Sequence, residues 1–261
     1  MISNWLQRMR KRRHAWNITK NKKRIKMRYG QGEERYQAIE FFNELGGQQG
    51  AAGLLERFMV KVDHSIRDEE EKQDVFNRLT AFGKQDVLPA IEEYLNRRDA
   101  SKVPVTWPMK VLDRLAQPEE VVTVLIRALE KLGIEYTKEP ERKVVLLSQL
   151  AEYSDPRVAP ALIPFLRDHR DEVKLEALSA ITRKADESAR EAMLDLLVDP
   201  ETPMRLRASI AESLMTLGWL VKGYRKKVEE VLPEGLHIDR SGRIKGRGTS
   251  PSPDDAEEEE D

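Results

Sequence analysis

The feature that most constrains this chain is an internal repeat with a period of 31 residues. The segment from Glu141 to Asp168 aligns without a gap onto the segment from Glu172 to Asp199. The aligned positions that are identical are Glu141/Glu172, Lys143/Lys174, Leu147/Leu178, Ser148/Ser179, Asp155/Asp186, Ala161/Ala192, Leu166/Leu197 and Asp168/Asp199. Self-similarity at a constant spacing indicates a chain built from copies of one small structural unit.

Further copies of one phrase occur upstream. "VLPAIEEYL" (Val87–Leu95) resembles "VAPALIPFL" (Val158–Leu166), and weaker copies are "VVTVLIRAL" (Val121–Leu129) and "GAAGLLERF" (Gly50–Phe58). The anchors of successive copies lie 31 to 37 residues apart. That spacing is typical of repeats made of two helices.

The apolar spacing within each copy predicts helices. Val158, Ala161, Leu162, Phe165 and Leu166 follow the i, i+3, i+4, i+7, i+8 pattern of one buried helical stripe. We therefore expect helix pairs near residues 34–58, 70–96, 108–132, 141–168, 171–198 and 203–231. A single pair cannot bury its own stripe, so its stability should come from stacking on its neighbours.

Proline and glycine mark the expected helix ends. Asp155 is a predicted N-cap with Pro156 at the first helical position, whereas Pro164 predicts a bend. Four glycines follow an apolar residue that ends a periodic run, where left-handed backbone is expected: Gly46, Gly83, Gly133 and Gly218. For residues 58–66 we expect a helix extension or a linker rather than a strand.

These motifs resemble HEAT repeats, in particular the bacterial PBS-lyase-like HEAT group. The resemblance rests on the Asp155-Pro156-Arg157 turn, the dipeptides Val173-Lys174 and Met204-Arg205, and the alanines Ala177 and Ala208. It is strong over about 140–218 and weaker over 34–132. It implies an all-α fold, an α-solenoid of stacked antiparallel helix pairs of the HEAT/armadillo-like kind, whose concave face usually binds proteins.

The two ends of the chain have opposite charge. Residues 1–32 contain eleven Lys and Arg residues and no acidic one. "TSPSPDDAEEEED" at the other end should be a disordered acidic tail, preceded by a short hairpin around Ser241-Gly242. The expected organisation is thus a basic arm (1–33), about six helix pairs (34–232), and a hairpin followed by the tail (233–261).

Several interpretations of the basic arm stay open. Ile2, Trp5, Leu6 and Met9 cluster on one side of a helix and Trp16 returns to it, so the arm is expected to be amphipathic. It could lie on an anionic membrane surface, contact nucleic-acid phosphates, act as a presequence, cap the first helix pair through its two tryptophans, or be a plain extension. The predicted contact residues are Trp5, Arg8, Arg10, Lys11, Arg12, Arg13, Trp16, Lys22, Lys23 and Arg24.

No motif for catalysis, a metal or a cofactor is found in the sequence. The chain has no cysteine, and none of its four histidines stands in a metal-binding pattern. HEAT-like metal enzymes such as deoxyhypusine hydroxylase carry His-Glu pairs that this chain lacks, so their function is not carried over. The carboxylates of 68–74 are interpreted as helix capping by Asp68 and Glu71 rather than as a cation site. We expect no cofactor, no metal and no enzymatic activity.

The charged positions of the second helices predict a protein-binding face instead. Alternating signs suit a protein surface better than phosphates. The predicted partner-binding residues are Glu92, Glu93, Arg127, Arg157, Arg167, Arg190 and Asp195. Glu56, Arg57 and Glu191 are expected to be exposed beside them. Trp107, Tyr94 and Trp219 either add aromatic contacts or fill gaps between repeats.

The resulting functional hypothesis is a protein–protein interaction scaffold or adaptor, with the arm aiding localisation. The alternative is a DNA- or RNA-associated protein in which the arm holds the phosphates. No apolar run is long enough to cross a membrane, and no secretory apolar region is found near the first residue. We expect a monomeric cytoplasmic protein, or one that is peripheral at a membrane surface.

Overall fold

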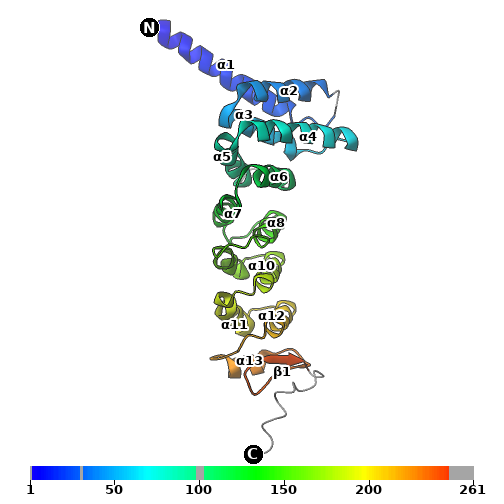
Figure 1. Ribbon diagram of the computed structural model, residues 1–261, viewed down its shortest axis with the longest axis vertical. Helices are drawn as coiled ribbons and strands as arrows, with labels where there is room; N and C mark the ends of the chain where they lie inside the picture. The colour runs from blue at the N-terminus through cyan, green and yellow to red at the C-terminus, as the bar shows by residue number, and fades with distance from the viewer. Residues whose placement is uncertain (1, 30–31, 98–102, 247–261) are drawn as a thin grey trace, which may run out of the picture. The chain divides into compact units, whose positions relative to one another are not determined.

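The computed structural model describes residues 2–29, 32–97 and 103–246, with the backbone alone at 2–4, 6 and 8. The chain divides into two compact units, Met1–Gly133 and Ile134–Asp261, and each unit is described by itself. Helices form most of both units (Figure 1).

In the first unit, a long helix α1 (Ile2–Arg24) precedes three helix pairs. The pairs are α2 (Glu33–Leu45) with α3 (Gly47–Leu55), α4 (Ser65–Phe82) with α5 (Lys84–Leu95), and α6 (Thr106–Leu115) with α7 (Pro118–Leu132). The short 3-10 helix η1 (Glu56–Met59) extends α3. The first helices α2, α4 and α6 form an A row, and the second helices α3, α5 and α7 pack on one another as a B row.

The closest packing in the first unit is between α3 and its neighbours. Residues 50–53 of α3 are Gly-Ala-Ala-Gly, and these small side chains let the helix approach α2 and α5 closely. A Cβ atom at Gly53 would collide with the ring of Phe42 on α2. The small residues of "GAAG" therefore allow close helix packing. The sequence repeat alone does not indicate this role.

The second unit contains the best copies of the repeat. Its pairs are α8 (Glu141–Leu150) with α9 (Val158–Leu162) and η2 (Ile163–Arg167), α10 (Asp171–Lys184) with η3 (Glu187–Ala189) and α11 (Arg190–Val198), and α12 (Met204–Leu217) with α13 (Arg225–Val231). Here α8, α10 and α12 form the A row, while η2, α11 and α13 form the B row. The strands β1 (Leu236–Ile238) and β2 (Ile244–Gly246) pair antiparallel after α13.

Repeated aspartates shape the turns of this unit. Asp155, Asp168, Asp186 and Asp199 each accept a hydrogen bond from the backbone N–H two residues later, at 2.8 to 2.9 Å. A side-chain acceptor in this position fixes the backbone of a turn. The identities Asp155/Asp186 and Asp168/Asp199 in the sequence repeat thus correspond to one turn structure used twice.

The prolines act differently from the prediction. Helix α9 begins at Val158, so Asp155 and Pro156 belong to the preceding turn and not to the helix start. At Pro164 the chain does not bend within one α-helix but changes to the 3-10 helix η2. Proline has no N–H to donate to the preceding turn and its ring crowds that turn, so an α-helical continuation is disfavoured at Pro164.

The other expected boundaries agree with the structure. All four predicted glycines have positive φ angles: Gly46 63°, Gly83 86°, Gly133 60° and Gly218 64°. Residues 58–66 hold the end of η1, an extended linker and the start of α4, with no strand assigned among them. The acidic residues 247–261 lie outside the described part of the chain.

The core lies between the helices of successive pairs. Ile39, Leu54, Ile91 and Leu125 are fully buried in the first unit, as are Leu147, Leu162 and Ile210 in the second. The predicted all-α class is confirmed, and within each unit the helix pairs stack as in an α-solenoid.

Replacing Leu162 by Ala should lower the free energy of unfolding by about 2–5 kcal/mol, because its side chain is fully buried where α9 packs on α10. Urea unfolding measures the loss. The control is Val145→Ala on α8, which is 38% exposed and should cost about 0.5 kcal/mol or less. Equal effects of the two substitutions would contradict the stacking assignment.

Candidate functional site

Helix α1 carries the strongest candidate for a binding surface. The C-terminal end of α1, which we call its attached end, is held by two buried residues. Ile25 is fully buried directly after the helix, and Asn21 is 8% exposed. Two ammonium groups of this end, Lys26 and Lys22, lie 3.0 and 3.9 Å from the carboxylate of Glu56. The side of α1 that contains Asn21 and Ile25 therefore packs against α2 and α3.

The opposite side of α1 carries a stripe of large side chains, Trp5, Met9 and Trp16, which we call the tryptophan stripe. Trp5 is 59% exposed, Met9 48% and Trp16 60%. With 3.6 residues per turn, the three point within about 40° of one another and about 120–180° away from Asn21 and Ile25. The stripe thus faces away from the helices that α1 packs on. A cap on the first helix pair through Trp5 and Trp16 is accordingly ruled out.

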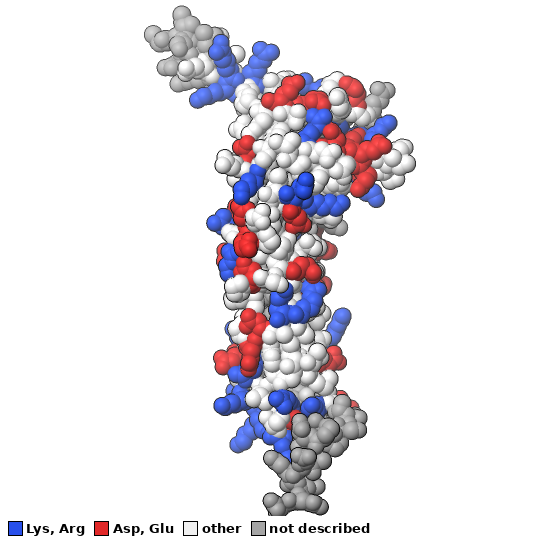
Figure 2. All heavy atoms as spheres, in the orientation of Figure 1, with Lys and Arg blue, Asp and Glu red and all other residues white. Residues whose placement is uncertain are grey.

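Positive charge surrounds α1. Residues 10–13 are four consecutive cations, and consecutive helical residues point about 100° apart, so these four occupy nearly the whole circumference. The separation of apolar and charged faces that the sequence analysis expected is therefore weak. Lys and Arg appear on α1 without Asp or Glu among them (Figure 2).

Most of the predicted arm residues are exposed. Arg10, Lys11, Arg12, Arg13 and Lys23 are exposed, Lys22 and Arg24 are half-buried, and the side chain of Arg8 lies outside the described residues. Within the described part of the chain, no carboxylate forms an ion pair with residues 10–13, Lys20 or Lys23. These cations are available to an external anion.

The carboxylate of Glu56 is the point to which the attached end of α1 is fixed. Glu56 is 3% exposed and accepts a hydrogen bond of 2.8 Å from Arg97, in addition to its contacts with Lys22 and Lys26. A pocket of about 230 Å³ beside it is lined by Lys22, Ala52, Glu56, Ala90, Glu93, Tyr94 and Arg97. The prediction that Glu56 is exposed is wrong, because three cations from α1 and the end of α5 cover it.

A second buried ionic cluster joins α2, η1 and α4. Arg35 donates to both oxygens of Glu71, at 2.9 and 2.8 Å. Arg57, which is fully buried, donates to Glu71 at 2.9 Å and to Asp68 at 2.7 Å. Lys72 adds a 2.7 Å bond to Asp68. Each charged group of this cluster has a partner of opposite charge within it, so the cluster links the three elements that carry it.

This cluster corrects two predictions. Helix α4 begins at Ser65, and its N-cap is His64, whose ring nitrogen Nδ1 accepts from the N–H of Arg67 at 3.2 Å. Asp68 and Glu71 lie about one and two turns after this N-cap and do not cap the helix. Arg57 is buried instead of exposed, because carboxylates 11 and 14 residues away in the sequence surround its guanidinium.

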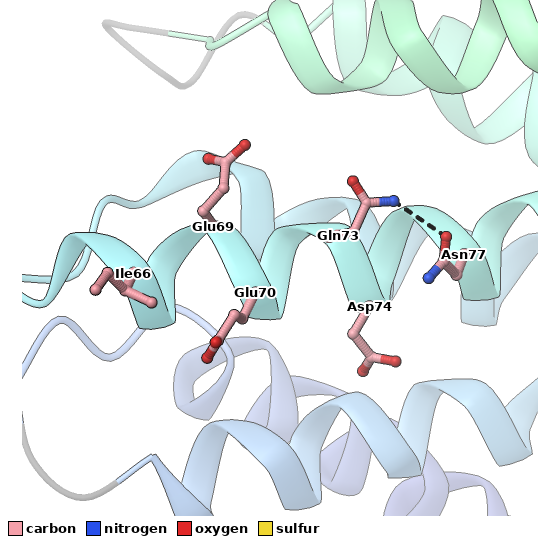
Figure 3. A pocket seen from close by; sticks show the side chains of 6 residues that line it. All are labelled: Ile66, Glu69, Glu70, Gln73, Asp74 and Asn77. Carbon is pink, nitrogen blue, oxygen red and sulfur yellow. Dashed lines mark hydrogen bonds between the residues drawn. The ribbon is translucent and has the colours of Figure 1, made fainter.

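The exposed side of α4 forms a shallow hollow of about 630 Å³ (Figure 3). It is lined by Ile66, Glu69, Glu70, Gln73, Asp74 and Asn77, all from this single helix. Glu69 and Gln73 point to one side of α4 and Glu70 and Asp74 to the other, so the carboxylates do not converge. This hollow offers no set of groups that could act together on a ligand.

Six of the seven predicted partner-binding residues lie on the B rows of the two units, and Arg157 lies in the turn before α9. In the first unit Glu92 is 3.6 Å from Arg127, and Glu93 is exposed. In the second unit Asp195 is 3.7 Å from Arg167 and accepts a 2.6 Å hydrogen bond from the hydroxyl of Tyr224.

The two remaining predicted arginines also have partners within the second unit. Arg157 pairs with Asp155 at 2.7 Å, and Arg190 donates to the carbonyl oxygen of Leu220 at 2.9 Å. Each of these predicted residues except Glu93 has a partner in its own unit among the described residues, so the predicted face is of mixed sign and largely paired. Lys226 and Lys227 on α13 are exposed cations outside this set.

The three aromatic candidates are core residues. Tyr94 is 3% exposed, Trp107 8% and Trp219 9%. The ring of Trp107 stacks on Phe58 at 5.6 Å, and the hydroxyl of Tyr94 donates to the carbonyl oxygen of Pro104. Burial raises the pKa of Tyr94, which keeps its hydroxyl protonated. They fill gaps between helices and are not available to a partner.

Among the described residues, no group of three or more His, Asp or Glu side chains is placed to hold a metal ion. In the same part of the chain, none of the helices combines the length and the apolar character needed to span a membrane.

Replacing Glu71 by Gln should cost about 3–5 kcal/mol of stability, because Arg35 and Arg57 would keep their charges without this partner. Burial alone would raise the pKa of Glu71, but the hydrogen bonds from Arg35 and Arg57 outweigh it and hold the pKa below its ordinary value. The stabilisation is therefore complete above about pH 5, where the unfolded chain is also ionised, and is lost as the pH falls through the folded-state pKa.

Denaturant unfolding between pH 3 and 7 tests this expectation. The wild-type protein should lose stability more steeply on acidification than Glu71→Gln. The control Glu69→Gln, on the exposed side of α4, should behave like the wild type. A Glu71→Gln variant as stable as Glu69→Gln at pH 7 would show that the cluster contributes nothing.

No family model and no curated protein matches the chain. A search of solved structures found human deoxyhypusine hydroxylase in complex with glycerol, with 14% sequence identity and a TM-score of 0.32 over 83% of this chain and 93% of that one. The TM-score is too low for this likeness to identify a repeat family, so the resemblance to the PBS-lyase-like group stays a prediction. The protein found is an enzyme, so the expectation of a chain without enzymatic activity is withdrawn. The low TM-score assigns no activity in its place.

Proposed function

We propose that this protein binds a nucleic acid through α1, while its helix-pair units serve as the body of an adaptor. The observation that carries the proposal is the surface of α1: cations on every side, no ion-pairing carboxylate among the described residues around 10–13, and exposed aromatic rings between them. Unpaired Lys and Arg side chains gain the most from phosphates, because they release counterions bound to the polymer.

This proposal places nucleic-acid binding before the protein scaffold, whereas the sequence alone favoured the scaffold. Most of the predicted partner-binding residues on the B rows have a charged partner in their own unit, as Glu92 has Arg127 and Asp195 has Arg167. Paired charges are already partly satisfied and attract a partner less strongly than unpaired ones. The charges of α1 are thus the stronger basis for recognition.

An anionic membrane is a less suitable partner for α1. A helix that lies in the interface keeps its cations on one face and its apolar residues on the other. Here Arg12 and Lys23 lie within about 60° of every member of the tryptophan stripe, so burying the stripe in lipid would also bury these cations. A polymer that carries phosphates along its length can contact cations on several sides.

The second candidate is a protein scaffold that uses the B rows. Exposed Glu93 and the mixed charges around Asp195 favour it, because alternating signs are typical of surfaces that bind proteins. In this interpretation α1 only adds affinity or localisation, and removing its cations would leave recognition of the main partner intact.

The variant Arg10→Gln/Lys11→Gln/Arg12→Gln/Arg13→Gln in the full chain tests the proposal. Its affinity for a 20-nucleotide single strand should fall roughly tenfold or more near 0.15 M salt. The slope of log affinity against log salt should become shallower by up to about 3, since each lost phosphate contact removes about 0.7. Fluorescence anisotropy over a salt series measures both quantities.

The matched control removes four exposed cations from the second unit: Lys222→Gln, Lys226→Gln, Lys227→Gln and Arg240→Gln. It has the same net charge as the α1 variant and should bind nearly as the wild type does. Equal weakening by both variants, or none by either, would reject α1 as the nucleic-acid site and leave the protein scaffold as the better reading.

A further inference from the structure

Electrostatic contacts with phosphates do not account for the two exposed tryptophans of α1. Trp5 and Trp16 are each about three-fifths exposed, whereas Trp107 and Trp219 are at most 9% exposed. They lie eleven residues apart, three helical turns or about 16 Å along α1, and point to the same side. Phosphate binding requires Lys and Arg but no indole ring, so the stripe indicates a second kind of contact.

We infer that the partner of α1 is a single-stranded nucleic acid whose bases stack on Trp5 and Trp16. This inference rests on the proposed function and names the class of its ligand. Proteins that hold single strands combine a basic track for the backbone with aromatic rings on which bases stack. The described part of α1 has both elements on one face: exposed indoles at 5 and 16, and the cations at 12, 20 and 23 beside them.

The position of Lys20 supports this arrangement. Its ammonium nitrogen lies 5.0 Å from the centre of the Trp16 ring. Because the ring is 60% exposed, a base can stack on it while Lys20 contacts the adjoining phosphate.

A duplex fits the same surface less well. Its bases are already stacked on one another and present only their edges, so the indoles would meet phosphates and sugars. Indole rings that cannot stack on the face of a base would add little to the affinity for a duplex. The stripe is therefore expected to discriminate single strands from duplexes, while the surrounding cations bind both.

The variant Trp5→Leu/Trp16→Leu in the full chain tests the inference. Leucine keeps the helix propensity and an apolar side chain but removes the ring. Affinity for a 20-nucleotide oligo(dT) should fall at least about tenfold, from the loss of two stacked bases. The salt slope and the affinity for a 20-base-pair duplex should stay unchanged, because no charge is removed. Trp5→Phe/Trp16→Phe retains rings and should keep most of the single-strand affinity.

Intrinsic fluorescence gives a second readout. Oligo(dT) should quench the wild-type emission but not that of the Leu variant, whose remaining tryptophans are buried. Wild-type affinity of the Leu variant for oligo(dT), with loss of binding in the four-cation α1 variant, would overturn stacking and leave the proposed function intact. Binding to phosphatidylserine vesicles but to neither nucleic acid would overturn both.

Discussion

Each described helix pair buries its apolar stripe only by packing on the pair before or after it, and the rest of the structure depends on this constraint. Leu54, Ile91 and Leu162, which occupy one position in the repeated phrase, are all fully buried. Because contacts join neighbours in sequence, each unit can grow by adding pairs without changing those already present. Most charged residues of the pairs lie outside, where some form local ion pairs, whereas a few are buried with a partner of opposite charge.

Charge is used in two ways. In the first unit, Arg57 and Arg35 lie inside the helix stack with Glu71, and Glu56 lies beneath the attached end of α1. These buried ions favour one arrangement of the helices, because a buried charge that lacks its partner is destabilising. The described cations further along α1 lack such partners. This contrast between compensated and uncompensated charge separates the framework of the first unit from its candidate binding surface.

The repeat made the helix pairs and their boundaries predictable, because apolar spacing and glycine positions are local signals. The buried ions were not predictable from such signals. Arg57 lies within a copy of the repeated phrase, where it was expected to be exposed, yet it is fully buried. Its partners are Asp68 and Glu71, which only the folded chain brings to it. Likewise, helical spacing predicts that Trp5 and Trp16 share one side of α1. It does not predict which side of α1 packs on α2 and α3.

We propose that recognition is localised on α1, with the stacked helix pairs as its support. Amide hydrogen exchange of the full chain, with and without a saturating 20-nucleotide single strand, measures this claim most directly. The account predicts slower exchange over residues 5–24, with little change along α8, α10 and α12. Slower exchange over η2, α11 and α13, with α1 unaffected, would contradict it and place recognition on the B row of the second unit.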